Sequence, residues 1–268
     1  MVLECVINVS EGTHLEAVAT FAQAVADDLL DVHSDPDHHR SVFTLVGTWA
    51  PRELATHVVD ICNINDHYGV HPRIGVVDVV PFVALDGSTE EDALRARDEF
   101  AEWAATRLHV PCFLYGPERT LPFIRKHAWK GLTPDVGPHA PHPTAGAMCV
   151  GVRRPLVAYN LWLTSPLDVA MSIAASIRSE TVRALGLQVG EFTQVSMNLV
   201  EPEITGPHHV YDQVSQHVDI HHAELVGLIP ARALAPIPRD QWERLDVSPQ
   251  KTIEWQLAQR MDRLRNRD

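Results

Sequence analysis

One short segment combines residue types that could perform acid–base chemistry. It runs His71-Pro72-Arg73-Ile74-Gly75-Val76-Val77-Asp78-Val79-Val80-Pro81-Phe82. Pro72 favours extended backbone at His71 and prevents a helix from continuing through it, and Gly75 permits a tight entry into the apolar strand that follows. An imidazole at the mouth of a strand can serve as a general base near neutral pH. A purely structural histidine is the alternative that these residues leave open.

Asp78 interrupts a run of valines in the same segment. A carboxylate in an apolar core is costly unless it has a partner, and Arg73 and His71 are the nearest in sequence. We therefore expect Asp78 to orient the acid–base group, with a satisfied strand aspartate as the alternative.

A second feature is a segregated basic region in a chain whose formal net charge is −13. Asp135 is the one acidic residue among its six basic ones, which are Arg119, Arg125, Lys126, Lys130, Arg153 and Arg154. Guanidinium groups recognise anions through paired hydrogen bonds, so this region favours an anionic small molecule. The alternative is a solvated loop that pairs with acids elsewhere, such as Glu90, Glu91 and Asp92.

The 16 histidines make a metal site worth considering. His33, His38 and His39 lie among aspartates, and His217 precedes His221 and His222, but the HExxH pattern is absent. We expect no required metal. Phosphate-loop, dinucleotide-binding and serine-hydrolase motifs are also absent.

Composition narrows the class of protein further. The 268 residues are 45% hydrophobic and 21% charged, enough for one large or two modest domains. The negative charge argues against nucleic-acid binding, no run of eighteen apolar residues predicts a membrane span, and residues 1–9 do not resemble a signal peptide. Scattered cysteines (Cys5, Cys62, Cys112 and Cys149) favour free thiols and a cytoplasmic location.

Strand-like and helix-like patterns alternate along the chain, which predicts an α/β fold of two successive βα units joined near residue 160. Strands are expected at 3–9, 41–47, 75–85, 110–115, 147–152, 156–163, 194–200 and 224–229. Helices are expected at 14–29, from 51, from 89, within 121–129, and at 166–185, 207–218 and 248–265. The stretch 116–146 is mostly irregular.

Several of these motifs, in this order, resemble the formiminotransferase family. The resemblance rests most on the HPRxGxxDVxPF element at 71–82, and extends over essentially the whole chain. Other matching segments are Asn8-Val9-Ser10-Glu11-Gly12, Arg40 through Gly47, Leu114-Tyr115-Gly116, Gly151-Val152-Arg153-Arg154, Ala158-Tyr159-Asn160, Asn198-Leu199, Leu225 through Pro230 and Ile253-Glu254-Trp255.

The resemblance implies transfer of a formimino group from N-formiminoglutamate to N5 of tetrahydrofolate, in one-carbon metabolism and histidine degradation. It implies two subdomains, 1–160 with the catalytic histidine and 161–268, with a substrate groove between them, and commonly a homodimer. His71 would be the acid–base catalyst, supported by Asp78 and Arg73. The implied folate-contacting residues are Ala145, Gly146, Ala147, Met148, Cys149, Val150, Gly151, Val152, Arg153 and Arg154.

Two departures from the family pattern leave the substrate open. His33 stands where animal members carry an aspartate, with Asp35 or Asp37 as possible substitutes, and the basic loop at 178–183 is short. Transfer of a formyl group, a donor such as N-formiminoglycine, or folate binding without turnover remain alternatives, as does a metal-dependent hydrolase. No cyclodeaminase segment is present, so a separate protein is expected to process the product.

Overall fold

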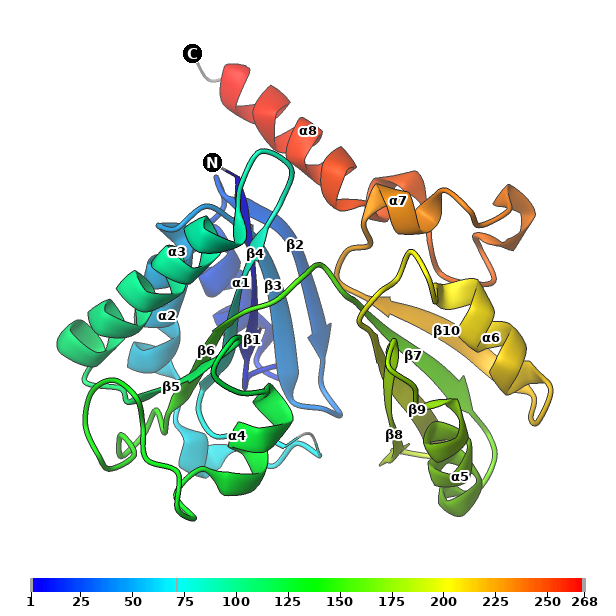
Figure 1. The fold of residues 1–268 in the computed structure, drawn as a ribbon, viewed down its shortest axis with the longest axis horizontal. Helices are drawn as coiled ribbons and strands as arrows, with labels where there is room; N and C mark the ends of the chain where they lie inside the picture. Colours follow the sequence, from blue (N-terminus) through cyan, green and yellow to red (C-terminus); the bar gives the residue numbers. More distant parts are fainter. Residues whose placement is uncertain (1, 71, 267–268) are drawn as a thin grey trace. The chain divides into compact units, whose positions relative to one another are not determined.

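A computed structural model describes residues 2–70 and 72–266, which form two compact units divided between Arg154 and Pro155 (Figure 1). This confirms the α/β class with two successive βα units. The expected boundary near residue 160 lies inside a strand, β7 (Val157–Leu163), that belongs to the second unit.

The first unit is built on a six-stranded mixed sheet of order β2-β3-β1-β4-β6-β5. Its strands are β1 (Leu3–Val9), β2 (Leu29–Asp35), β3 (Arg40–Val46), β4 (Val77–Ala84), β5 (Cys112–Tyr115) and β6 (Met148–Val152). Pairing is antiparallel from β2 to β4, and β6 runs parallel to both β4 and β5. Strand β6 therefore lies inside the sheet, directly beside the strand that follows the His71 motif.

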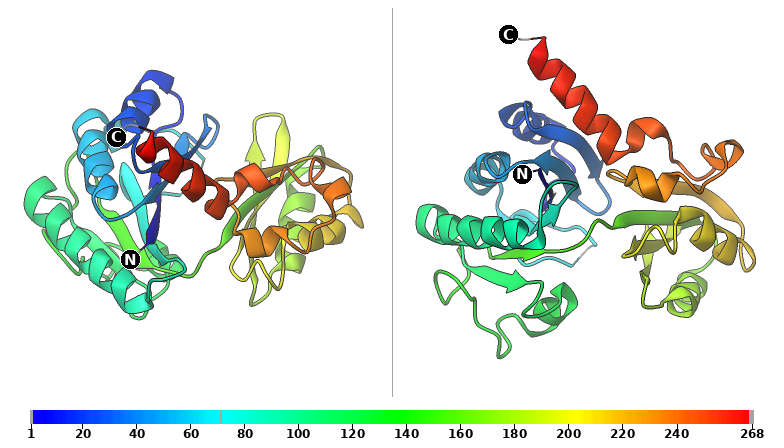
Figure 2. Two further views of the ribbon diagram at one scale, coloured as in Figure 1. Left: turned by 90° about the horizontal axis from the view of Figure 1, so that it is seen from above. Right: turned by 45° about the horizontal axis from the view of Figure 1, so that its top comes forward.

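Helices cover both faces of this sheet. On one face lie α1 (Leu15–Ala24), α2 (Ala50–Ile61) and α3 (Glu90–Trp103), whose Phe21, Leu54 and Phe100 pack into the main core (Figure 2). The opposite face carries α4 (Leu121–His127), whose buried Ile124 packs with Phe113 and Cys149. The irregular stretch predicted around α4 is confirmed, because no other α-helix or strand longer than a bridge falls within the described residues 117–147.

The second unit has a four-stranded antiparallel sheet of order β10-β7-β9-β8. Its further elements are α5 (Leu167–Ile177), β8 (Val182–Val189), β9 (Phe192–Leu199), α6 (Pro207–Ser215), β10 (Ile220–Val226), α7 (Ala231–Leu234) and α8 (Ile253–Arg265). Apolar side chains of α5 and α6 share one core with the sheet.

Two of the long helices predicted from sequence are wrong in extent. The helix expected at 14–29 ends at Ala24 and is followed by β2, and the helix expected at 166–185 ends at Ile177 and is followed by β8. Both missed strands lie at a sheet edge. Few residues of either strand are fully buried, so neither has the continuous apolar run that identifies buried strands.

The helix predicted from residue 89 is confirmed as α3, which begins at Glu90. Thr89 caps it, and the Thr89 side chain and the Asp92 carboxylate form a reciprocal capping box. All four cysteines are free thiols. Within the described residues, no helix is both long and apolar enough to cross a bilayer.

Candidate functional site

His71, the predicted acid–base catalyst, lies outside the described residues, which include the segments on either side of it. Arg73 folds back on the chain that precedes position 71, because its guanidinium donates to the carbonyl of Gly69 at 2.9 and 3.1 Å and to that of His67 at 3.4 Å. Arg73 thus holds together the two ends of the segment 67–73. This is a positioning contact for the motif.

The entry into β4 is fastened to the start of β6. Val76 N–H donates to the Ala145 carbonyl at 3.0 Å, and Ala147 N–H donates to the Ile74 carbonyl at 2.9 Å. The approach at Gly75 leaves no room for a side chain, since a Cβ there would lie 2.1 Å from the Ala147 carbonyl oxygen. The motif and the first part of the predicted folate-contacting stretch are therefore neighbours, although 70 residues separate them in sequence.

Asp78 is fully buried and held by two arginines. Arg125 of α4 donates to both carboxylate oxygens, at 2.9 Å to Oδ1 and over a shorter distance to Oδ2, and Arg40 of β3 donates to Oδ2 at 3.2 Å. The Ile74 N–H adds a bond to Oδ1 at 2.8 Å. Burial alone would raise the pKa of Asp78, but the charges of Arg125 and Arg40 outweigh it and lower the pKa below its usual value.

Asp78 is therefore ionised at neutral pH, and its two arginine partners lie 38 and 47 residues away in sequence. The sequence expectation of a nearby partner, His71 or Arg73, did not anticipate either arginine. Neighbours in the primary chain are a weak guide here because α4 and β3 reach Asp78 only through tertiary packing.

The predicted folate-contacting stretch divides into two parts. Most of its side chains are buried in the sheet, including Met148, Cys149 and Val150 at 1% exposure or less, so they can contact a ligand only through neighbouring backbone. Arg153 and the exposed Arg154 follow the carboxyl end of β6. The five residues of β6 separate Ala147 from Arg153, and six steps along a strand span about 20 Å, so the two arginines lie at the far end of β6 from Gly75.

The basic region is partly neutralised by its own surroundings. Arg119 pairs with Asp135, and Arg125 pairs with Asp78. Asp92, considered above as a partner, instead accepts from Thr89 and Arg95. Two of the six basic side chains, Arg119 and Arg125, therefore form ion pairs with acidic residues of the same unit.

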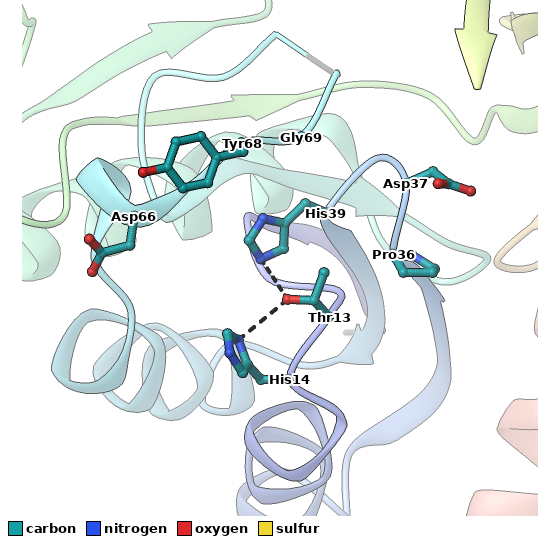
Figure 3. Close-up of a pocket in the computed structure, with 8 residues that line it drawn as sticks. All are labelled: Thr13, His14, Pro36, Asp37, His39, Asp66, Tyr68 and Gly69. Carbon is teal, nitrogen blue, oxygen red and sulfur yellow. Dashed lines mark hydrogen bonds between the residues drawn. The ribbon is translucent and has the colours of Figure 1, made fainter. Parts of the chain in front are cut away.

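A pocket of about 330 Å³ opens beside the segment that leads to position 71 (Figure 3). Its lining residues are Thr13, His14, Pro36, Asp37, His39, Asp66, Tyr68 and Gly69. They come from the loop after β1, the β2–β3 turn and the segment 66–69. Sequence reasoning singled out His39 and Asp37 but missed His14 and Thr13. The short spacing of Glu11, Thr13 and His14 was the available signal.

The family departures also have places in the structure. His33 lies in β2 opposite Val42, and Asp35 caps the β2–β3 turn by accepting from the His38 N–H at 2.9 Å. Asp37 lies in the wall of the pocket. The short segment 178–183 connects α5 with β8 and is anchored by a bond from Arg178 Nε to the Ala184 carbonyl at 2.8 Å.

No cysteine is suited to act as a nucleophile. Burial raises the pKa of Cys62 and of Cys112 to about 12, and it raises the pKa values of Cys5 and Cys149 as well. A thiol attacks as its thiolate, so all four are inert at neutral pH. The arrangement favours acid–base chemistry over covalent catalysis through sulfur.

Comparison with known proteins identifies related sequences over both units. Residues 2–153 match the model of the formiminotransferase domain, N-terminal subdomain, and residues 158–240 match that of the formiminotransferase domain. A glutamate formimidoyltransferase of Streptococcus pyogenes serotype M1 is 34% identical over 273 residues, covering 88% of this chain and 91% of the relative. One from Thermoplasma acidophilum is 30% identical over 282 residues, with coverage of 88% and 91%.

Longer relatives match as well. The formimidoyltransferase-cyclodeaminase of Sus scrofa is 32% identical over 276 residues, or 87% of this chain. The match spans 51% of that protein, so this chain covers about half the length of such relatives.

Proposed function

Because this chain belongs to the formiminotransferase family, we propose that it transfers a formimino group from N-formiminoglutamate to N5 of tetrahydrofolate. The observation that carries the proposal is the match of both units to the family, in order, with 91% coverage of a relative named glutamate formimidoyltransferase. The backbone hydrogen bonds between residues 74–76 of the motif and residues 145–147 also support the proposed function, because they bring the motif next to the predicted folate-contacting stretch.

The proposed reaction is an exchange of two amines at an amidine carbon. N5 of tetrahydrofolate attacks the formimino carbon and forms a C–N bond, and the bond to the glutamate nitrogen breaks after a tetrahedral intermediate. N5 loses a proton and the glutamate nitrogen gains one. A single imidazole, His71, can accept the first proton and deliver the second, which contributes a rate factor of about 10²–10⁴.

The other residues of the site have supporting roles in this proposal. Arg73, Arg153 and Arg154 neutralise carboxylates of the two substrates. Asp78 positions the strand entry through Arg40 and Arg125, with no part in proton transfer. Holding both substrates in register supplies a further and larger share of the rate enhancement. No step of the exchange requires a metal ion or a redox cofactor, and tetrahydrofolate enters as a co-substrate.

The test is a steady-state assay of the purified chain with tetrahydrofolate and N-formiminoglutamate, N-formiminoglycine or 5-formyltetrahydrofolate. Turnover of N-formiminoglutamate at the highest kcat/KM supports the proposal. Preference for another donor would change the assigned substrate but not the type of reaction. Other donors are included because His33 stands where animal members of the family carry an aspartate. Binding of reduced folate with no turnover of any donor would overturn the enzymatic role.

We propose further that the chain forms a homodimer and acts in the cytoplasm, with a separate cyclodeaminase consuming the 5-formiminotetrahydrofolate. Four free thiols suit a reducing compartment. Light scattering at assay concentrations tests the dimer, and a mass of 29.8 kDa would contradict it.

A further inference from the structure

Two histidines that line the pocket, His14 and His39 (Figure 3), lie close to the carboxylate of Glu11. Glu11 follows β1, His14 precedes α1, and His39 ends the β2–β3 turn. His14 Nδ1 lies 2.9 Å from Glu11 Oε2, and His39 Nε2 lies 3.1 Å from Glu11 Oε1. The three ligand atoms lie within 4.8 Å of one another. Among the described residues, this is the one group of histidine, cysteine and carboxylate side chains gathered so closely.

We propose that Glu11, His14 and His39 bind a divalent transition-metal ion of the zinc type. Two imidazoles and one carboxylate are a ligand set that zinc accepts, with a fourth position left for water. Ligands about 2.0–2.2 Å from a tetrahedral ion lie about 3.3 Å apart. The two observed N···O separations, each to a different oxygen of Glu11, are within a few tenths of an ångström of that value, so a bound ion would require a limited rearrangement of the cluster.

The carboxylate is already fixed in place. Glu11 Oε1 accepts from the backbone N–H groups of Thr13 and His14 at 2.8 and 2.9 Å. The His14 ring bonds to the other oxygen, Oε2, at 2.9 Å, so both carboxylate oxygens are held in place. The metal would be bound by one anion and two neutral imidazoles, each histidine giving up the proton on its coordinating nitrogen.

The neighbouring residue His67 fixes both the ring and the backbone of His39. Its φ of 49° lies in the left-handed region, where a histidine needs support from its surroundings. The ring of His67 stacks on the His39 ring at 4.1 Å between centroids and bonds to the His39 carbonyl at 2.7 Å.

The surroundings favour entry of a cation. The side chain of His14 is 74% exposed, whereas those of Glu11 and His39 are 10% and 13% exposed. The pocket wall contains Asp37 and Asp66. Because Mg²⁺ and Ca²⁺ prefer all-oxygen sites, a pair of imidazoles selects for Zn²⁺, Co²⁺ or Ni²⁺. The bound ion would link the loop after β1 to the β2–β3 turn.

The experiment titrates the metal-free full chain with Zn²⁺ by calorimetry and with Co²⁺ by visible absorption. We expect one ion per chain, Co²⁺ bands of a low-coordinate site, and an increase in Tm with Zn²⁺ but not with Mg²⁺. Because the readout is binding, a failure here says nothing about formimino transfer, and loss of transfer says nothing about this site.

Variants assign the ligands. His14→Asn changes an exposed side chain and His39→Asn retains a residue type that tolerates positive φ; each should weaken Zn²⁺ binding by at least about tenfold, as loss of a ligand does. The matched control is His57→Asn, which removes a histidine paired with Glu53 at 3.3 Å but with no second histidine. Unchanged Zn²⁺ affinity in His14→Asn and His39→Asn, or equal loss in His57→Asn, would overturn the proposal, as would no binding by the parent chain.

Discussion

Arg125 of α4 donates hydrogen bonds from Nη1 and Nη2 to the two oxygens of the fully buried Asp78 carboxylate in β4. The pair joins a helix on one face of the sheet to the strand that continues the His71 motif. With Arg40 on the same carboxylate, two cations share one anion. This arrangement gives Asp78 a fixed charge and a positioning role.

Loss of the Asp78 charge should strongly destabilise the first unit. Asp78→Asn removes the negative charge that two nearly buried guanidinium groups share, and breaking such a buried pair costs about 3–5 kcal/mol. Urea denaturation measures the free energy of unfolding. The control is Asp262→Asn, which removes the exposed partner of Arg265 and should change little. An Asp78→Asn chain as stable as the parent would contradict the role.

The same carboxylate predicts a pH dependence. Since the folded pKa of Asp78 lies below its ordinary 3.8, the stability that its charge contributes is complete above pH 3.8 and is lost as pH falls through the folded value. The stability difference between the parent and Asp78→Asn should therefore shrink below pH 3.8. Urea unfolding between pH 2 and pH 6 measures it, and a difference constant over that range would be inconsistent with the lowered pKa.

Removal of the proposed acid–base group should abolish most activity. His71→Gln keeps a polar side chain but cannot cycle a proton, so kcat should fall by about 10²–10⁴-fold. Binding of reduced folate should remain, which calorimetry would verify. Exposed His109→Gln is the control. Undiminished kcat in His71→Gln would refute the mechanism.

Arg154 is predicted to recognise the anionic end of the folate. A hydrogen bond to a charged group contributes about 1.5–3 kcal/mol, so Arg154→Ala should raise KM for reduced folate about ten- to a hundredfold. The KM for N-formiminoglutamate and kcat should stay close to the parent values. Arg107→Ala, another exposed arginine, is the comparison variant. If Arg154→Ala and Arg107→Ala have equal KM values for reduced folate, Arg154 does not contribute to folate binding.

Buried elements were predictable from the sequence because their patterns are local. The strand at 3–9 has the predicted limits, the strand predicted at 41–47 is shifted by one residue at both ends, and the strand predicted at 147–152 begins one residue later. Each lies inside the sheet, where a continuous apolar run is required on both faces. The strands β2 and β8 were not predicted because few of their residues are fully buried, so no continuous apolar run marks them.

The sequence by itself determined the α/β class, the free thiols, the family motif and the candidate base. Only the tertiary structure decided which distant residues meet: Asp78 with Arg40 and Arg125, the motif with residues 145–147, and Glu11 with His14 and His39. The physical reason is that a residue's spacing in sequence fixes its place on its own element. Which charged side chains lie next to it depends on how separate helices and strands pack, and the local sequence pattern does not determine that packing.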